Sequence, residues 1–453
     1  MSSRRKPIVA IIHSASSKWT STGEDLAVYL GVCLQLGGYS DVRIIGFQGN
    51  EGSRTGLEET KARSGRDGVP FSGDVSLQQQ RSQRFSVVPY AGSKPEYPNH
   101  AECFRDVWES LPKCNVILIC VDPEDTAACA SALSSEVEKG SDKAVIGFDL
   151  GVRNHTAIEE RLGSHGLILL GGAVGISVAR SPIDGHLRCL GAGSLVVERL
   201  SKQQSKRGVK FVNLLRSGAI PVRHCKNVTS YTHGAIIFNT LHPVAILAGI
   251  PLRDLVRDRR VRLLWAAMIR EGLGVLALAA GGGDWRAANP CCSLTLPQLE
   301  LFLCLPTPLF GVVSYLFLRF PQKLAPAMQT DLAGGRDTSV AWTLEEIVRI
   351  ADKHKGAAPA CRAVLSAVKT SVSRGDGVPS TPVRDLPFVR ELLSKGSDST
   401  RALGRKLVVW CSSAILGATA LWLLGGVWVA AGGVSFGVFV FFVNFALVGD
   451  VVP

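Results

Sequence analysis

The chain has 453 residues, enough for two or three domains with substantial cores, and 46% of its residues are apolar. Its net charge is +12, but the basic residues are scattered with few aromatic residues among them, which argues against a nucleic-acid partner. Its 12 cysteines include no CxxC pair, a spacing that argues against a disulfide scaffold and a metal site. We therefore expect reduced, mostly buried thiols and no bound metal.

The N-terminal part alternates strand-like and helix-like segments. A short apolar run at Pro7–Ile12 predicts a buried strand, and Glu24–Leu36 has helical spacing that ends before two glycines. Residues Gln48–Ser82 are polar and rich in Gly, Ser and Arg, which is typical of a long loop. Further strands are predicted at Asp41–Phe47, Asn115–Val121, Ala144–Phe148 and Leu167–Leu170. This order indicates a doubly wound α/β domain.

From about Lys206 the apolar spacing becomes helical. The predicted helices are Gly234–Ala248, Arg259–Ala280, Leu344–Lys353 and Ala360–Val372. A long apolar stretch, Leu301–Phe320, contains Pro306 and Pro308, and we interpret it as a buried or interfacial segment. Residues Ser373–Ser399 are rich in Ser, Pro, Gly and charge, which indicates a linker.

The segment Leu407–Val448 contains no charged residue and is long enough for two membrane spans of about 20 residues each. Glycine pairs at Gly425–Gly426 and Gly432–Gly433 could form the turn between them. We therefore predict a transmembrane helical hairpin, with the lipid bilayer as a partner. Basic residues just before the segment predict soluble domains on the cytosolic or matrix-like side.

Three stretches resemble the ketopantoate reductase (2-dehydropantoate 2-reductase) family. The first, within Asn115–Gly193, contains NVILICVDPEDTAACASAL and AVIGFDLGVRNHTAIEERLG. The second begins GAIIFNTLHPVAILAG. The third and most specific contains LPTPLFG and PAMQTDLAGGRDTSVAWTLEEI, similar to the family's LP, helix and SMxQDLxxGRxTEID pattern.

The resemblance implies a Rossmann-like domain that binds NADPH, followed by an all-α domain. We therefore divide the chain into a Rossmann-like domain at 1–204, a helical domain at 205–371, a polar linker at 372–405 and a transmembrane hairpin at 406–450.

The family's cofactor turn, a GxGxxG motif after the first strand, is altered in this chain. The turn reads HSASSK at His13–Lys18 and has no glycine before Gly23. Glu24 and Asp25 follow in the first helical turn, where their charges would repel a pyrophosphate. The sequence therefore predicts weak NADPH binding or none.

Other positions that the resemblance assigns to the cofactor are also changed. The family has a lysine where this chain has Asp122. It has the asparagine of its LQNG motif where this chain has Leu150. The family's cofactor-binding positions are occupied by Ser14, Ser16, Lys18, Asp122 and Leu150. A second glycine-rich motif, GGAVG at Gly171–Gly175, lies in mid-chain and is interpreted as unrelated to nucleotide binding.

The family's general acid is a lysine early in the first helix of the helical domain. Alignment on Pro243 places Gly234 at this position, and alignment on Asn239 places Ala235 there. Neither side chain can deliver a proton, which leaves the adjacent His233 as a candidate substitute.

Of the remaining substrate-contacting positions, Asn239 keeps the family's amide and the others are changed. Ser339 stands for the glutamate that orients the ligand. The positions assigned to substrate binding are occupied by Asn239, His242 and Ala327.

These substitutions predict a membrane-anchored ketopantoate reductase-like protein that is catalytically degenerate and acts as a binding, scaffold or membrane-complex subunit. One alternative is an active NADPH-dependent oxidoreductase, such as a 2-dehydropantoate 2-reductase of pantothenate biosynthesis, with relocated catalytic groups. Another is a sensor that binds nucleotide without turnover. A protein partner in a membrane complex is expected, and homodimerisation is left open.

Overall fold

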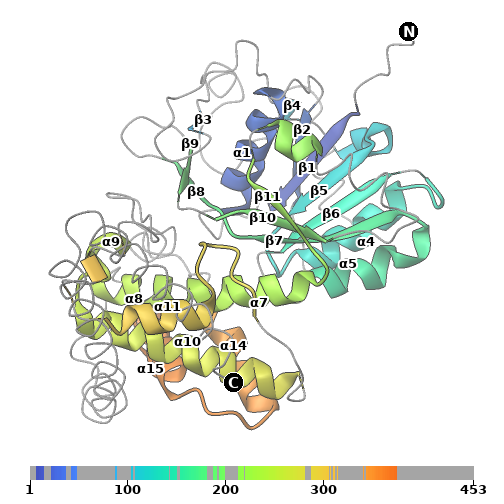
Figure 1. The fold of residues 1–453 in the computed structure, drawn as a ribbon. Coiled ribbons are helices and arrows are strands. Elements are labelled where there is room, and N and C mark those ends of the chain that lie inside the picture. The colour runs from blue at the N-terminus through green and yellow to red at the C-terminus, as the bar shows by residue number, and fades with distance from the viewer. Residues whose placement is uncertain are drawn as a thin grey trace, which may run out of the picture.

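The computed structural model describes residues 7–14, 22–36, 42–47, 87–88, 104–105, 108–141, 143–149, 154–180, 187–190, 193–198, 213–218, 220–280, 287–305, 307, 310–311, 314, 340 and 343–374. The predicted loop Gln48–Ser82 and the predicted hairpin Leu407–Val448 lie outside the described residues. Among the helices within these ranges, none combines the length and the hydropathy needed to cross a bilayer. Figure 1 shows a sheet domain beside a helical domain.

An eight-stranded sheet forms the first domain, in the order β11-β10-β7-β6-β5-β1-β2-β4. Its strands are β1 (Val9–Ser14), β2 (Val42–Phe47), β4 (Phe104–Arg105), β5 (Val116–Cys120), β6 (Ala144–Asp149), β7 (Ile168–Val174), β10 (Leu195–Glu198) and β11 (Val222–Cys225). The pairs are parallel except for β7 with β10. This is the Rossmann-like domain expected from the sequence.

The central strand β1 shows why this sheet is covered on both faces. All six of its residues are buried, as in a parallel strand between two helical layers. Val9 and Ile11 pack with α1 (Thr22–Leu36) on one face. Ala10 and Ile12 pack on the other face with α4 (Thr126–Glu136) and α5 (Asn154–Leu162). The carboxyl ends of the strands are thereby fixed between two cores.

Several short elements complete the domain. They are the 3-10 helices η1 (Trp108–Lys113) and η2 (Gly163–His165), and a small sheet of β3 (Val87–Val88), β9 (Leu187–Leu190) and β8 (Ser177–Arg180). The sequence did not predict this sheet, nor β10 and β11. Because β11 ends at Cys225, the large sheet extends beyond residue 204, where the sequence had placed the domain boundary.

The second domain is helical throughout its described residues. It contains α7 (Val228–Asn239), α8 (Leu241–Ala248), α9 (Leu252–Leu255), α10 (Arg259–Ala279), α11 (Leu296–Leu303), α14 (Leu344–Lys353) and α15 (Pro359–Arg374). The long helix α10 contacts α7, α8, α11, α14 and α15, and its Trp265 is fully buried in their common core. The all-α architecture predicted for this region is confirmed.

The single helix predicted at Gly234–Ala248 is wrong in one respect, because α7 and α8 divide there. Pro243 lies in the first turn of α8 and has no N–H to donate. Its ring would also clash with the carbonyl four residues earlier in a continuous helix, which is the carbonyl of Asn239, where α7 ends.

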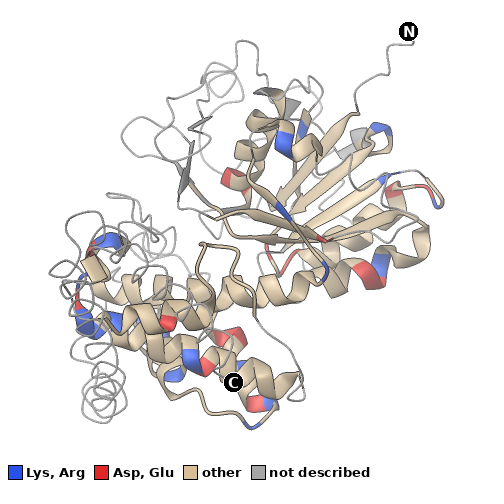
Figure 2. Ribbon diagram, viewed as in Figure 1, with Lys and Arg blue, Asp and Glu red and all other residues tan. Residues whose placement is uncertain are grey.

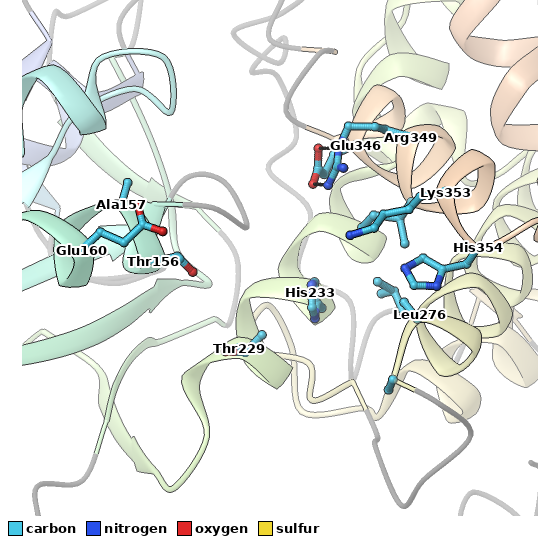
Figure 3. A pocket seen from close by; sticks show the side chains of 13 residues that line it. Thr156, Ala157, Glu160, Thr229, His233, Leu276, Glu346, Arg349, Lys353 and His354 are labelled. Atoms are coloured by element: carbon cyan, nitrogen blue, oxygen red, sulfur yellow. Dashed lines mark hydrogen bonds and ion pairs between the residues drawn. The ribbon is translucent and has the colours of Figure 1, made fainter.

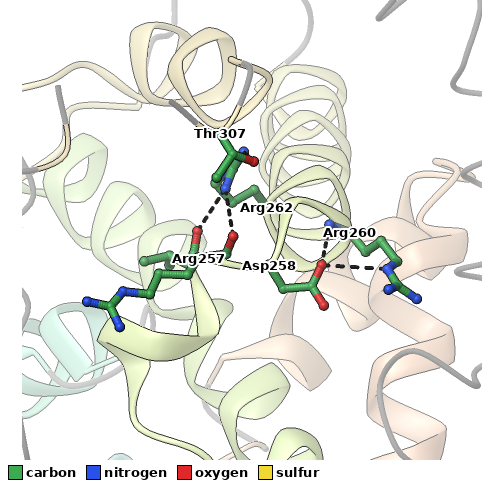
Figure 4. Close-up of polar contacts among 6 residues, drawn as sticks. Arg257, Asp258, Arg260, Arg262 and Thr307 are labelled. Carbon is green, nitrogen blue, oxygen red and sulfur yellow. Dashed lines mark hydrogen bonds and ion pairs between the residues drawn. The ribbon is translucent and has the colours of Figure 1, made fainter. Parts of the chain in front are cut away.

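In the apolar stretch that begins at Leu301, the buried residues are Phe302, Leu303, Leu305 and Phe310. Arg262 of α10 holds this stretch in place and lies beside Thr307 in Figure 4. The fully buried guanidinium of Arg262 donates to the carbonyls of Leu303 and Leu305 at 3.2 and 3.0 Å. It also donates to Thr307 Oγ1 at 3.2 Å and lies 4.2 Å from the ring centroid of Phe310. Burial lowers the pKa of Arg262 to about 10, so the side chain stays charged at neutral pH.

The described basic residues are dispersed and most of the described cysteines are buried. Lys and Arg side chains of the described elements are spread over both domains rather than gathered on one helix face (Figure 2). Nine cysteines within the described ranges are free thiols, and seven of these nine are buried.

Candidate functional site between the two domains

The carboxyl ends of β1 and β5 meet at the point where the strand order reverses, which is where dinucleotides bind in this fold. Ser14 ends β1, and Asp122 follows β5. The structure brings these two predicted cofactor positions together, because the Asp122 N–H donates to Ser14 Oγ at 2.8 Å. Both residues are buried. The serine hydroxyl therefore serves as an acceptor within the chain.

The N-terminus of α1 faces the same point. A Cβ on Gly23 would lie 2.4 Å from the carbonyl oxygen of Cys120, so only glycine lets α1 approach β5 this closely. The same Cβ position lies 3.8 Å from Asp122 Oδ1, which brings the chain's own carboxylate to the helix N-terminus. Glu24 and Asp25 add acidic residues in the first turn. Negative charge thus already occupies the region where a phosphate would be stabilised.

The other predicted cofactor positions give less information. Ser16, Lys18 and Leu150 lie outside the described residues. The glycine-rich motif that starts at Gly171 lies largely within β7 and forms no phosphate-binding turn. A Cβ on Gly171 would lie 2.5 Å from a methyl carbon of Val228, so this glycine lets α7 pack closely on the sheet.

A segment that we call the strap, residues 287–292, covers α7 at the position matched to the family's lysine. A Cβ on Gly234 would lie 1.8 Å from the carbonyl oxygen of Ala288, closer than any nonbonded contact permits. The Ala288 N–H donates to the Ser230 carbonyl at 3.0 Å and fixes the strap against the helix. Position 234 therefore has no room for any side chain, and the alternative, Ala235, is buried.

The strap also binds the sheet domain. The Ser194 N–H, at the start of β10, donates to the carbonyl of Pro290 at 3.0 Å. Asn289 of the strap accepts from the Cys291 N–H at 2.9 Å and donates to the carbonyl of Leu294, just after the strap, at 2.8 Å. Because Asn289 is buried, these bonds are shielded from water. The strap thus connects the two domains by backbone hydrogen bonds.

A cavity of about 630 Å³ lies between α5 of the sheet domain and α7, α10 and α14 of the helical domain (Figure 3). Its lining includes Thr156, Ala157, Glu160, Thr229, His233, Leu276, Ala279, Ala280, Glu346, Arg349, Ile350, Lys353 and His354. The volume lies within the range of small-molecule sites, roughly 300–1,000 Å³. Among the predicted site residues that the structure describes, only His233 lines it.

This cavity lies on a different face of α7 from the positions matched to the family's acid and amide. Thr229 and His233 line it and are spaced four residues apart. Ala235 and Asn239 are spaced in the same way but lie about 120° around the helix at 3.6 residues per turn. The cavity is therefore displaced from the line of residues that the family resemblance assigns to substrate.

The buried end of the cavity is electrostatically balanced. Glu346 is 8% exposed and accepts two hydrogen bonds from Arg349, at 2.8 and 2.5 Å. Burial lowers the pKa of the neighbouring His233 to about 4, although the charge of Glu346 opposes this shift. The imidazole is therefore uncharged at neutral pH and cannot act as a cationic proton donor.

The remaining candidates are placed as follows. Asn239 is half-buried at the end of α7, and His242 is half-buried in α8, where burial lowers its pKa to about 4. Ser339 and Ala327 lie outside the described residues. Sequence reasoning missed Glu160, Arg349 and Lys353, which only the tertiary fold brings to one cavity. The helical spacing of Glu346, Arg349 and Lys353 was the available signal.

Comparison with known proteins supports the resemblance read from the sequence. Residues 232–372 match the sequence model of the family described as "Ketopantoate reductase PanE/ApbA C terminal". No curated protein matches the chain by sequence.

Several solved structures are similar in fold. A PanE/ApbA family ketopantoate reductase from Ralstonia eutropha JMP134 is 18% identical, with 81% of this chain and 99% of that chain covered and a TM-score of 0.52. D-mandelate dehydrogenase with NADH and anilino(oxo)acetate is 14% identical over 81% and 99% of the two chains, with a TM-score of 0.54. A 2-dehydropantoate 2-reductase from Geobacter metallireducens GS-15 is 12% identical over 80% and 99%, with a TM-score of 0.51. The predicted resemblance to the ketopantoate reductase family is confirmed, with large divergence in sequence.

Proposed function

We propose that the chain is a membrane-anchored ketopantoate reductase-like protein that has lost the family's reduction chemistry and acts as a binding, scaffold or membrane-complex subunit. The observation that supports this most strongly is the contact between the strap and α7. The carbonyl of Ala288 occupies the space that a side chain at position 234 would need.

A reductase of this kind needs a proton donor within hydrogen-bond reach of the oxygen that accepts the proton. Position 234 has no room for a donor, and Ala235 carries only a methyl group. His233 is uncharged at neutral pH and faces the cavity on another side of α7. These features support the loss of the general acid.

The arrangement of acidic groups at the sheet edge supports weak cofactor binding. Proteins of similar fold hold a nicotinamide cofactor, as the D-mandelate dehydrogenase complex with NADH illustrates. In this chain the Asp122 carboxylate lies near the α1 N-terminus, and Glu24 and Asp25 share its first turn. We propose an NADPH affinity at least about tenfold weaker than a glycine-rich turn gives, a difference of about 1.4 kcal/mol.

The membrane part of the proposal rests on the sequence. The uncharged segment Leu407–Val448 would span the bilayer as a hairpin, and the basic residues before it would keep both domains on the cytosolic or matrix-like side. A protein partner in the same membrane is proposed because the chain would bind rather than turn over.

The rival function is an active NADPH-dependent oxidoreductase with relocated catalytic groups. It draws support from His233, which lines the cavity close enough to Glu346 for the two to interact electrostatically. The low pKa of His233 disfavours this role, because few imidazoles are protonated at neutral pH.

The test is NADPH consumption by the detergent-purified full chain in the presence of ketopantoate. We expect no turnover above the rate without enzyme, in the wild type and in His233→Ala alike. Turnover that His233→Ala abolishes and Glu159→Gln preserves would establish the rival. Glu159 is a suitable control because it is exposed on α5 and does not line the cavity.

A further inference from the structure

Opposite charges face each other across the interdomain cavity. Glu160 belongs to the α5 wall, while Lys353 and His354 come from the end of α14 on the opposite wall (Figure 3). Neither Glu160 nor Lys353 forms an ion pair with another side chain of the described residues. By contrast, Glu346 and Arg349 neutralise each other at the buried end. The cavity therefore has a negative wall and a positive wall.

The surface between these walls is suited to a short carbon chain. Leu276 and Ile350 contribute buried apolar surface, and Ala279 adds a small apolar residue. The hydroxyls of Thr156 and Thr229 add polar groups. A sphere with the volume of this cavity is about 11 Å across, large enough for a molecule of several carbons.

We propose that this cavity binds a small zwitterion whose ammonium and carboxylate groups lie at opposite ends of a short carbon chain. The ammonium faces Glu160, and the carboxylate faces Lys353 and His354. The carbon chain lies over Leu276 and Ile350. This assignment rests on the proposed binding function and names the class of ligand that the cavity takes.

The charge balance favours such a zwitterion over other classes of ligand. A dianion would meet two carboxylates, Glu160 and Glu346, while Arg349 is already engaged. A simple amine would leave the positive wall without a partner, and a simple carboxylate would leave the negative wall without one. An α-amino acid carries both charges on neighbouring atoms and cannot reach both walls at once.

The test is calorimetric titration of the detergent-purified full chain with 6-aminohexanoate, after subtraction of the detergent blank. Hexanoate and hexylamine, which carry one charge each, and glycine, whose charges are adjacent, are titrated in parallel. We expect 6-aminohexanoate to bind about threefold to fivefold more tightly than each of these, because each exposed charge contributes modestly.

Two variants locate the ends of the ligand. Glu160→Gln is expected to weaken 6-aminohexanoate about threefold to fivefold and to leave hexanoate unchanged, whereas Lys353→Gln weakens both. Glu159→Gln, the neighbouring exposed change on α5, should have no effect. Equal affinity for 6-aminohexanoate and hexanoate, or an unchanged affinity in Glu160→Gln, would overturn the assignment.

The titration with 6-aminohexanoate and the turnover assay with ketopantoate can fail independently of each other. Turnover with ketopantoate would contradict the proposed function without changing the ratio of the two affinities. Failure of 6-aminohexanoate to bind would leave the turnover result intact. Displacement of bound 6-aminohexanoate by NADPH would place the cofactor in the cavity and overturn the assignment.

Discussion

The sheet edge near β1 and the cavity beside α14 differ in the burial and hydrogen bonding of their polar side chains. At the sheet edge, Ser14 and Asp122 are buried and hydrogen-bonded to each other. At the cavity, Glu160 and Lys353 stay exposed on facing walls. The comparison indicates that polar side chains at the sheet edge can be satisfied by internal contacts while those at a neighbouring cavity stay open to solvent.

The largest effect is expected at the strap. Gly234→Ala places a Cβ 1.8 Å from the Ala288 carbonyl, so the strap must move or the fold must strain. We expect a loss of about 3 kcal/mol or more in unfolding free energy, measured by denaturant titration of the full chain followed by tryptophan fluorescence.

The matched control is Gly274→Ala in α10, where an added Cβ meets nothing within 4 Å. Alanine is the better helix former, so this variant should be more stable by about 0.5–1 kcal/mol. Similar stabilities for the two variants would show that the strap does not close α7.

The next largest loss in unfolding free energy is expected at Arg262, a buried cation of the helical domain. Arg262→Met removes the donor shared by the carbonyls of Leu303 and Leu305 and by Thr307. Leaving the buried carbonyls of Leu303 and Leu305 unsatisfied should cost about 2–3 kcal/mol in the same titration. Arg257→Met, at a side chain that is 67% exposed, should change stability by less than about 0.5 kcal/mol. Equal effects would mean that Arg262 is not a central contact.

A smaller effect is expected from His233 in the cavity, as a pH dependence of the unfolding free energy. The folded-state pKa of His233 is about 4, below its ordinary value near 6.5. The unfolded chain therefore binds the proton first, and the folded state loses stability as the pH falls from about 6.5 to about 4. We expect His233→Gln to remove about 1–2 kcal/mol of this loss, measured as the difference in unfolding free energy between pH 7 and pH 4.5. An unchanged loss would assign the effect elsewhere, for instance to His242, whose pKa is also about 4.

The smallest change in unfolding free energy is expected for the exposed side chains of the cavity walls. Glu160→Gln should change the unfolding free energy by less than about 0.5 kcal/mol, because the carboxylate is exposed and forms no ion pair within the described ranges. A loss above about 1 kcal/mol would show that Glu160 stabilises the domain contact rather than awaiting a ligand.

Buried strands and amphipathic helices were predictable because each leaves a local pattern. The continuous apolar run at β5 and the helical spacing of α14 gave their bounds to within a residue. β10 and β11 were missed because each has four residues and is stabilised by pairing with distant strands. The hydrogen bond between Asp122 and Ser14 was not predicted, because it depends on how the ends of β1 and β5 meet.

The strap and the cavity could not be predicted, for different reasons. At Gly234 the sequence shows that a side chain is missing but not that a backbone carbonyl fills the space. The cavity joins Glu160 of one domain to Lys353 of the other, and no local pattern relates such distant positions. Helical spacing in α14 predicted the helix that carries one wall, while the opposite wall depends on how the domains pack.

We propose above all that the sheet edge binds NADPH only weakly. Calorimetric titration of the detergent-purified full chain with NADPH tests it most directly. We predict a dissociation constant well above micromolar, because Asp122, Glu24 and Asp25 bring negative charge to the α1 N-terminus. Micromolar or tighter binding of NADPH would contradict the account.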